Sequence, residues 1–275
     1  MTSPVDAPFE EGRGRAVNFI SKQKLPMLFV EGGIDKYILN YHFKNTARVV
    51  IPQKKDLNGQ KGRKGGKSLV KEKVESDKDS FGFVDMDYDF KSSFVKLNHR
   101  LEDSSPKSCL VSLLLDDKNI KKFILTMLKK RGISAEKDVE NVLKLAKAHS
   151  VVIWDRGMAG EKGFKIPEIN EEDLWKRLLS SIDVEEFTEM LSALQNGTSL
   201  RIFWRVNKQF LSIAGVRDHS LVKAIVRYVE SKKSAKWPTG KNQIEQNLAG
   251  FVKYLPLNEK LIRFRESIHN KTLKV

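Results

Sequence analysis

Four acidic side chains follow two short apolar segments of this sequence and could together bind a metal ion. Glu31 comes directly after the first segment. Asp85, Asp87 and Asp89 come directly after the second. Side chains of an extended chain alternate between two faces, so the three aspartates can point the same way. Carboxylates this close remain ionised together only around a cation, and oxygen ligands suit Mg²⁺ or Mn²⁺. The chemistry to expect is therefore metal-assisted.

The segments around these acids predict the elements that position them. The apolar run 26–30 fits a buried parallel strand, and the helical spacing of apolar residues over 34–41 predicts a helix after it. Residues 48–51 and 81–84 predict the second and third strands. Alternation of strand, helix and strand implies right-handed crossovers and a parallel sheet, hence an α/β fold with a Rossmann-like sheet flanked by helices. Glu31 and the first aspartate would then lie at carboxyl ends of strands, where functional groups collect in such sheets.

The rest of the chain predicts a helical second half. Residues 109–115 and 151–154 read as further strands, and residues 91–108 look irregular. Further helices are expected over residues 16–22, 120–130, 139–149, 171–180, 184–194, 221–229, 243–254 and 261–268, with one more strand considered at 198–204. We therefore divide the chain into a polar lead-in (1–24), an α/β catalytic domain (25–160) and a mainly helical C-terminal domain (161–275).

The acidic cluster has alternative interpretations. It could be a solvated acidic turn. An EF-hand loop is excluded, because its sixth and twelfth positions would be Phe90 and Lys96 instead of Gly and Glu. A haloacid-dehalogenase phosphotransferase also places Asp-x-Asp after an apolar strand, but with Thr or Val where this chain has Asp89. Asp35, in the first turn of the helix after Glu31, is either a metal ligand or a partner of the helix N-terminus.

The stretch 53–68 is rich in Lys, Arg and Gly and predicts a mobile basic loop. It ends in Gly-Gly-Lys-Ser but is not a P-loop, because Lys61 stands where the motif needs its first glycine. We therefore expect no bound nucleotide cofactor. Arg63, Lys64 and Lys67 are instead candidates to contact a nucleic-acid backbone beside the metal site. The alternative is a solvated run of charge.

Composition narrows the class of partner. Lys and Arg number 50 against 35 Asp and Glu, a net charge of +15, which favours polyanions such as nucleic acid. No apolar run approaches the roughly 20 residues of a membrane span, and the N-terminus lacks the features of a secretory signal. The single cysteine, Cys109, excludes an intramolecular disulfide framework. The five histidines show no spacing typical of a Ser/His/Asp site, and we expect a cytoplasmic protein.

A family resemblance joins these features. Val30-Glu31-Gly32 followed by Asp35, and Val84-Asp85-Met86-Asp87, resemble the two signature segments of Toprim domains, which occur in topoisomerases, primases and overcoming-lysogenization-defect nucleases. With Gly-Lys-Ser between them, the order is most similar to the Toprim nuclease effectors of the PARIS anti-phage system. The resemblance covers about residues 25–90, with weaker similarity of layout to about 155.

The resemblance implies a Mg²⁺- or Mn²⁺-dependent endonuclease. Asp85 and Asp87 would hold the metal, and Glu31 would be a further ligand or the acid/base group; Asp89 and Asp35 are additional candidate ligands. The resemblance also implies a toxic effector of anti-phage defence that cleaves RNA, with tRNA as one candidate, under the control of an ATPase partner.

Two other function classes stay open. In one, the chain is a non-catalytic module that binds nucleic acid or a partner, and the acids are structural. In the other, it is a phosphotransferase with Asp85 as nucleophile. Whatever the function, a homodimer through apolar faces of the C-terminal helices is compatible with the sequence.

Overall fold

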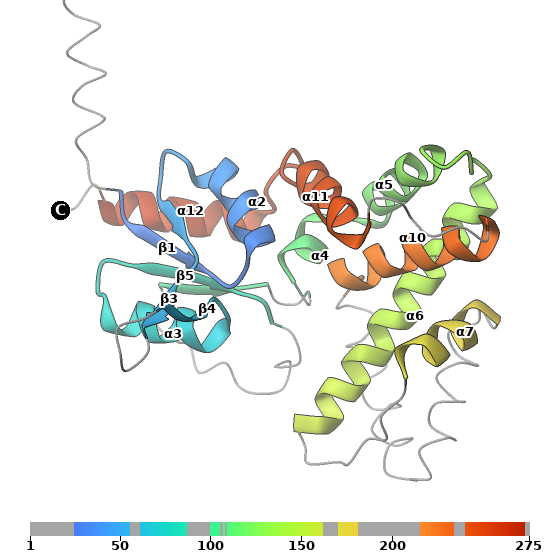
Figure 1. Cartoon of the computed structure of the whole chain (residues 1–275). Coiled ribbons are helices and arrows are strands. Elements are labelled where there is room, and N and C mark those ends of the chain that lie inside the picture. The colour runs from blue at the N-terminus through green and yellow to red at the C-terminus, as the bar shows by residue number, and fades with distance from the viewer. Residues whose placement is uncertain are drawn as a thin grey trace, which may run out of the picture.

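The computed structural model describes residues 25–55, 61–86, 100–104, 107, 109–161, 170–180, 215–233 and 240–272. A four-stranded, wholly parallel sheet with the strand order β2-β1-β5-β6 lies at one end of the molecule (Figure 1). Its strands are β1 (Met27–Val30), β2 (Arg48–Val50), β5 (Phe81–Val84) and β6 (Leu101–Asp103). The predicted α/β class, with a parallel sheet flanked by helices and a helical C-terminal region, is confirmed.

From β1 the chain runs first to the strand on one side of it and then to the strand on its other side. Helix α2 (Gly33–Phe43) leads from β1 to the edge strand β2, and α3 (Lys67–Ser76) leads back across to β5. The strand order therefore reverses between β1 and β5, and the carboxyl ends of these two strands form a topological switch point. In open α/β sheets this is where ligands bind.

The two faces of the sheet are packed by different helices, because strand side chains alternate. On one face, Phe81 packs edge-on against Phe264 of α12 (Glu259–Thr272), at 6.3 Å between ring centroids. On the other face, Phe29 shares a cluster with Val70 and Val74 of α3. A Cβ on Gly82 would lie 2.7 Å from the Val74 side chain, so α3 approaches β5 closely because residue 82 is glycine.

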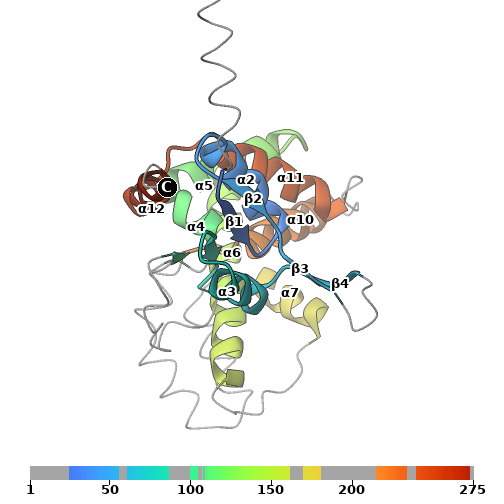
Figure 2. The same ribbon diagram turned by 90° about the vertical axis from the view of Figure 1, so that its left-hand side faces the viewer.

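The basic stretch 53–68, predicted as a loop, contains regular structure. Strands β3 (Gln53–Lys55) and β4 (Lys61–Lys64) pair antiparallel, and the hairpin extends from the body of the molecule (Figure 2). Helix α3 starts directly after it and was not predicted, because its sequence is mostly polar. Only Leu69, Val70 and Val74 are buried in α3.

Three other predictions were wrong. Residues 109–115 were predicted as a strand but contain helix α4 (Leu110–Leu114), and residues 151–154 belong to α6 (Glu136–Glu161). Both segments are short apolar runs, and apolarity alone does not distinguish a buried helix from a buried strand. The segment 91–108, expected to be irregular, includes β6, which is short and only half buried.

The helices predicted at 120–130, 139–149, 171–180, 221–229, 243–254 and 261–268 are confirmed, and all but the one at 171–180 have shifted ends. They are α5 (Asp117–Lys129), α6, α7 (Glu171–Ser180), α10 (Asp218–Lys233), α11 (Gly240–Val252) and α12. The predicted elements at 16–22, 184–194 and 198–204 lie outside the described residues. None of the helices in the described ranges combines the length and apolar character that a membrane span needs.

The C-terminal helices share a hydrophobic core with the sheet. One cluster of buried side chains runs from Leu28 in β1 to Ile268 in α12. Helix α11 packs against α2, and α10 packs along α6, so the helical part lies next to the carboxyl edge of the sheet (Figure 1). The predicted domain boundary falls at the end of α6, yet the helices beyond it help to enclose the space beside the switch point.

Candidate active site

The two acids predicted to meet at the sheet edge do meet. Glu31 follows β1 and Asp85 follows β5, and these strands pair in parallel with Val30 opposite Phe83. The Glu31 carboxylate, through Oε1, accepts a hydrogen bond of 2.7 Å from the Asp85 backbone N–H. The Asp85 carboxylate in turn accepts a bond of 2.9 Å from the backbone N–H of Leu110, the first residue of α4. The two acids are thus fixed to each other and to the start of α4.

Asp35 joins them from the first turn of α2. Its Oδ2 accepts a hydrogen bond of 3.1 Å from the backbone N–H of Gly32, so it satisfies a donor at the start of the helix. The side chain is nevertheless part of the acidic cluster, because Asp35 is buried and lines the same cleft as Asp85. Asp35 therefore has the predicted role of a partner of the helix N-terminus, and its role as a metal ligand stays a prediction.

The cluster concentrates negative charge. Burial raises the pKa of Asp85 well above its usual range, and the charges of Asp35 and Glu31 raise it further. A cation beside these carboxylates would remove the repulsion and hold Asp85 ionised, and carboxylate oxygens are ligands that Mg²⁺ and Mn²⁺ accept. The donor set therefore fits a hard divalent cation.

The described residues supply only part of a metal site. Within those ranges, no three His, Cys, Asp or Glu side chains are grouped closely enough to hold a metal ion by themselves. Asp87 and Asp89, predicted as further ligands, lie outside the described residues. A metal site built on Glu31 and Asp85 would thus need further ligands, for which Asp35, Asp87 and Asp89 are the candidates.

The glycine-rich turn after β4 lies against Glu31. The backbone N–H of Gly66 donates to the Glu31 carbonyl oxygen at 3.1 Å, and Gly65 donates to the Pro52 carbonyl at 2.8 Å. Both glycines have positive φ, 74° and 92°, and a Cβ on Gly65 would lie only 2.2 Å from the Glu31 oxygen. Glycine is therefore required here for a close approach of two backbones as well as for the conformation.

This turn brings one of the three predicted basic residues to the acids. The Lys67 ammonium donates to the Met86 carbonyl oxygen at 3.1 Å, one residue after Asp85. Arg63 and Lys64 belong to β4, immediately before the turn, but their side chains lie outside the described part. Lys67 therefore lies beside the acidic residues, whereas its contact with nucleic acid stays a prediction.

A cleft of about 900 Å³ opens above the acids, and its far wall comes from the C-terminal helices. Asp218 and His219 from the start of α10 and Glu245 from α11 line this wall. The His219 imidazole, through Nδ1, lies 3.3 Å from Glu245 Oε1. No sequence motif pointed to these residues, because their place opposite Glu31 depends on how helices separated from it by more than a hundred residues pack.

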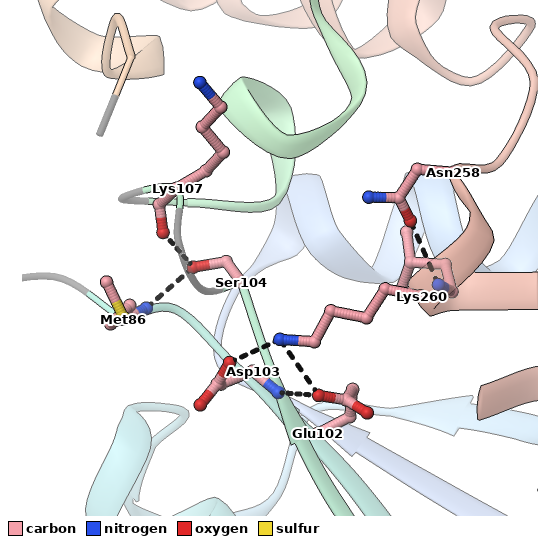
Figure 3. A network of polar contacts seen from close by, with 8 residues as sticks. Met86, Glu102, Asp103, Ser104, Lys107, Asn258 and Lys260 are labelled. Carbon is pink, nitrogen blue, oxygen red and sulfur yellow. Dashed lines mark hydrogen bonds and ion pairs between the residues drawn. The ribbon is translucent and has the colours of Figure 1, made fainter. Parts of the chain in front are cut away.

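The turn that carries Asp85 is fixed by hydrogen bonds to the segment that follows β6 (Figure 3). Buried Ser104 accepts a hydrogen bond of 2.8 Å from the Met86 backbone N–H and donates one of 2.8 Å to the Lys107 carbonyl. Beside it, Lys260 of α12 pairs with Asp103 at 2.7 Å and with Glu102 at 3.1 Å. Helix α12 is thereby tied to β6, and β6 to the end of β5.

Cys109 is close to the acids but is a poor nucleophile. Burial raises the pKa of its thiol to about 12, and the charges of Asp218 and Asp85 add to this effect. The thiolate, which is the reactive form, is therefore scarcely populated at neutral pH.

Comparison with known proteins gives no match: no family model, no curated protein and no solved structure corresponds to this chain.

Proposed function

We propose that this chain is a metal-dependent nuclease that hydrolyses phosphodiester bonds at the carboxyl edge of its sheet, with a Toprim-type arrangement of acids. One observation carries the proposal: Glu31 and Asp85, 54 residues apart, are joined by a 2.7 Å hydrogen bond at the switch point, inside a cleft. Carboxylates placed together at that point suit a divalent cation and, through it, a phosphate substrate.

The residue roles follow from position. Asp85 and Glu31 would hold the metal, with Asp87 as a further ligand and Asp35 and Asp89 as additional candidates. When bound, a divalent ion polarises the phosphodiester and lowers the pKa of a coordinated water. The chain itself contributes the orientation of Asp85, fixed by the Leu110 N–H, and a positive charge on Lys67 beside the acids.

The far wall supplies a group that can exchange a proton. His219 faces the cleft with Glu245 beside it, and imidazole is the side chain best suited to gain and lose a proton near neutral pH. In this proposal His219 protonates the leaving oxygen of the cleaved strand. The carboxylate of Glu245 would orient the ring.

The net charge of +15 supports nucleic acid as the substrate class. The resemblance to Toprim effectors of anti-phage defence extends the proposal to RNA, with tRNA as one candidate, to an ATPase partner that controls the activity, and to the cytoplasm as the place of action. The missing P-loop agrees with an external ATPase.

The test is incubation of purified protein with tRNA, single-stranded DNA and plasmid DNA, each with Mg²⁺, Mn²⁺ or EDTA. Cutting that needs the metal and is lost in Glu31→Gln is the expected result. Glu75→Gln, an exposed acid on α3, is the matched control and should cut like the wild type.

Two outcomes would count against the proposal. Absence of cutting by folded protein in every condition favours the non-catalytic binding module. An aspartyl-phosphate trapped at Asp85, formed whether or not Glu31 is present, favours the phosphotransferase.

A further inference from the structure

Three large side chains remain exposed on the surface near the cleft. Tyr37 is 48%, Tyr41 45% and Tyr254 68% exposed, and no other large apolar or aromatic side chain in the described residues is comparably exposed. Tyr37 and Tyr41 lie one turn apart on α2, whereas Tyr254 follows α11. Single exposed aromatics are common, but three at one place are characteristic of a binding surface.

The three rings form one cluster around a lysine. Tyr41 and Tyr254 meet edge to face, with ring centroids 5.4 Å apart. The Lys253 ammonium donates to the Tyr37 hydroxyl at 2.7 Å, and it lies 4.6 Å from the Tyr37 ring centroid and 4.8 Å from that of Tyr254. We call these four residues the tyrosine patch. Lys253 and Tyr37 are 216 positions apart in the sequence, so only the packing of α11 on α2 brings the patch together.

The patch is continuous with the candidate active site. Tyr37 lines the same cleft as Glu31, Asp35 and Asp85. A ligand lying on the exposed rings would therefore extend directly over the acids.

The chemistry of the patch fits unpaired nucleotides. Exposed aromatic faces stack on bases, and an ammonium among them attracts the phosphate backbone. In a duplex the base faces are already stacked on each other and unavailable, so ring stacking selects single strands, loops and ends. The excess of Lys and Arg over the whole chain acts in the same direction.

We infer that the tyrosine patch binds an unpaired segment of a nucleic-acid strand and leads it into the cleft. This inference rests on the proposed nuclease function and makes the substrate single-stranded, or paired RNA with an exposed loop.

Binding can be measured without cleavage. The full chain is titrated into a short fluorescein-labelled oligouridine, and into a duplex of equal length, in EDTA, and fluorescence anisotropy gives Kd. Tyr254→Ala should weaken oligouridine binding by about tenfold, since one stacked base is lost. Tyr254→Phe keeps the ring and should stay within about twofold of the wild type. Affinity for the duplex should change by less than about twofold in both variants, because backbone contacts dominate there.

Equal oligouridine affinity in wild type and Tyr254→Ala, with an unchanged Tm, would overturn the inference and leave a protein partner as occupant of the patch. An equal loss for strand and duplex would overturn it too. Because the titration is done in EDTA, it separates the two proposals. Cutting with no effect of Tyr254 on binding refutes the patch alone. Ring-dependent binding with no cutting refutes the nuclease alone.

Discussion

Replacement of Gly65 by alanine probes the contact between the glycine-rich turn and the end of β1. The residue has φ 74°, a conformation that side chains with a Cβ rarely adopt. Its added Cβ would lie 2.2 Å from the Glu31 carbonyl oxygen and 3.2 Å from Ile51 Cγ2. The oxygen belongs to the backbone, so no side-chain rotation can relieve the overlap.

The expected loss of stability has two parts. The left-handed conformation costs alanine about 1 kcal/mol relative to glycine. The overlap requires the turn and the end of β1 to move apart by about 1 Å, and forced repacking of this kind costs about 1–3 kcal/mol. Together these predict a decrease of about 2–4 kcal/mol in the free energy of unfolding. Because Glu31 moves with β1, metal-dependent cutting should fall as well.

Urea denaturation followed by circular dichroism measures this decrease. The matched control is Gly250→Ala in α11, where an added Cβ meets nothing within 4 Å. That change should leave stability the same or raise it by up to about 1 kcal/mol, because alanine is the better helix former. A Gly65→Ala protein within about 0.5 kcal/mol of the wild type would refute the close approach of the turn to Glu31.

Three further changes test the core and the support of the site. Burial lowers the pKa of His149 to about 3, whereas a histidine in the unfolded chain titrates near 6.5. The free energy of unfolding should therefore fall by about 1.4 kcal/mol per pH unit from about pH 6.5 downward. In His149→Phe, the difference between the urea midpoints at pH 8 and pH 5 should be smaller than in the wild type, and an equal difference would contradict this prediction. Ser104→Ala leaves the buried Met86 N–H without its acceptor and should cost about 1–3 kcal/mol in urea denaturation, with the exposed Ser68→Ala as a neutral control. Gly82→Ala should cost about 1–3 kcal/mol by overlap with Val74 and Leu101, and the double variant with Val74→Ala should lose less stability than the sum of the two single losses; fully additive losses would refute the overlap with Val74.

The sequence was sufficient to predict the centre of the site. Apolar runs before Glu31 and Asp85 predicted two buried parallel strands, and because parallel strands end at the same edge of a sheet, neighbouring strands would bring the two acids together. Lys67 was a candidate for contact with a nucleic-acid backbone beside the metal site, and its ammonium lies on the Met86 carbonyl oxygen, next to Asp85.

Other parts of the site depend on tertiary packing, which the spacing of apolar residues along the sequence does not predict. The two adjacent glycines at 65 and 66 indicate a turn in the sequence, but the contact of this turn with Glu31 depends on tertiary packing. Residues 110–114 are as apolar as a strand; they form a helix whose first N–H, on Leu110, bonds to Asp85. The wall with His219 and Glu245, and the tyrosine patch, exist only once α10 and α11 pack against the sheet domain.

The central claim is that Glu31 and Asp85 belong to a divalent-cation site, and Mn²⁺ binding tests it without knowledge of the substrate or a partner. Free Mn²⁺ is followed by electron paramagnetic resonance during titration of the wild type, Asp85→Asn and the Glu75→Gln control. Asparagine removes a charge that its neighbours disfavour, so Asp85→Asn should fold at least as stably as the wild type. Saturable binding in the wild type and the control, lost in folded Asp85→Asn, is the predicted result. Equal binding in Asp85→Asn, or none in the wild type, would contradict the account.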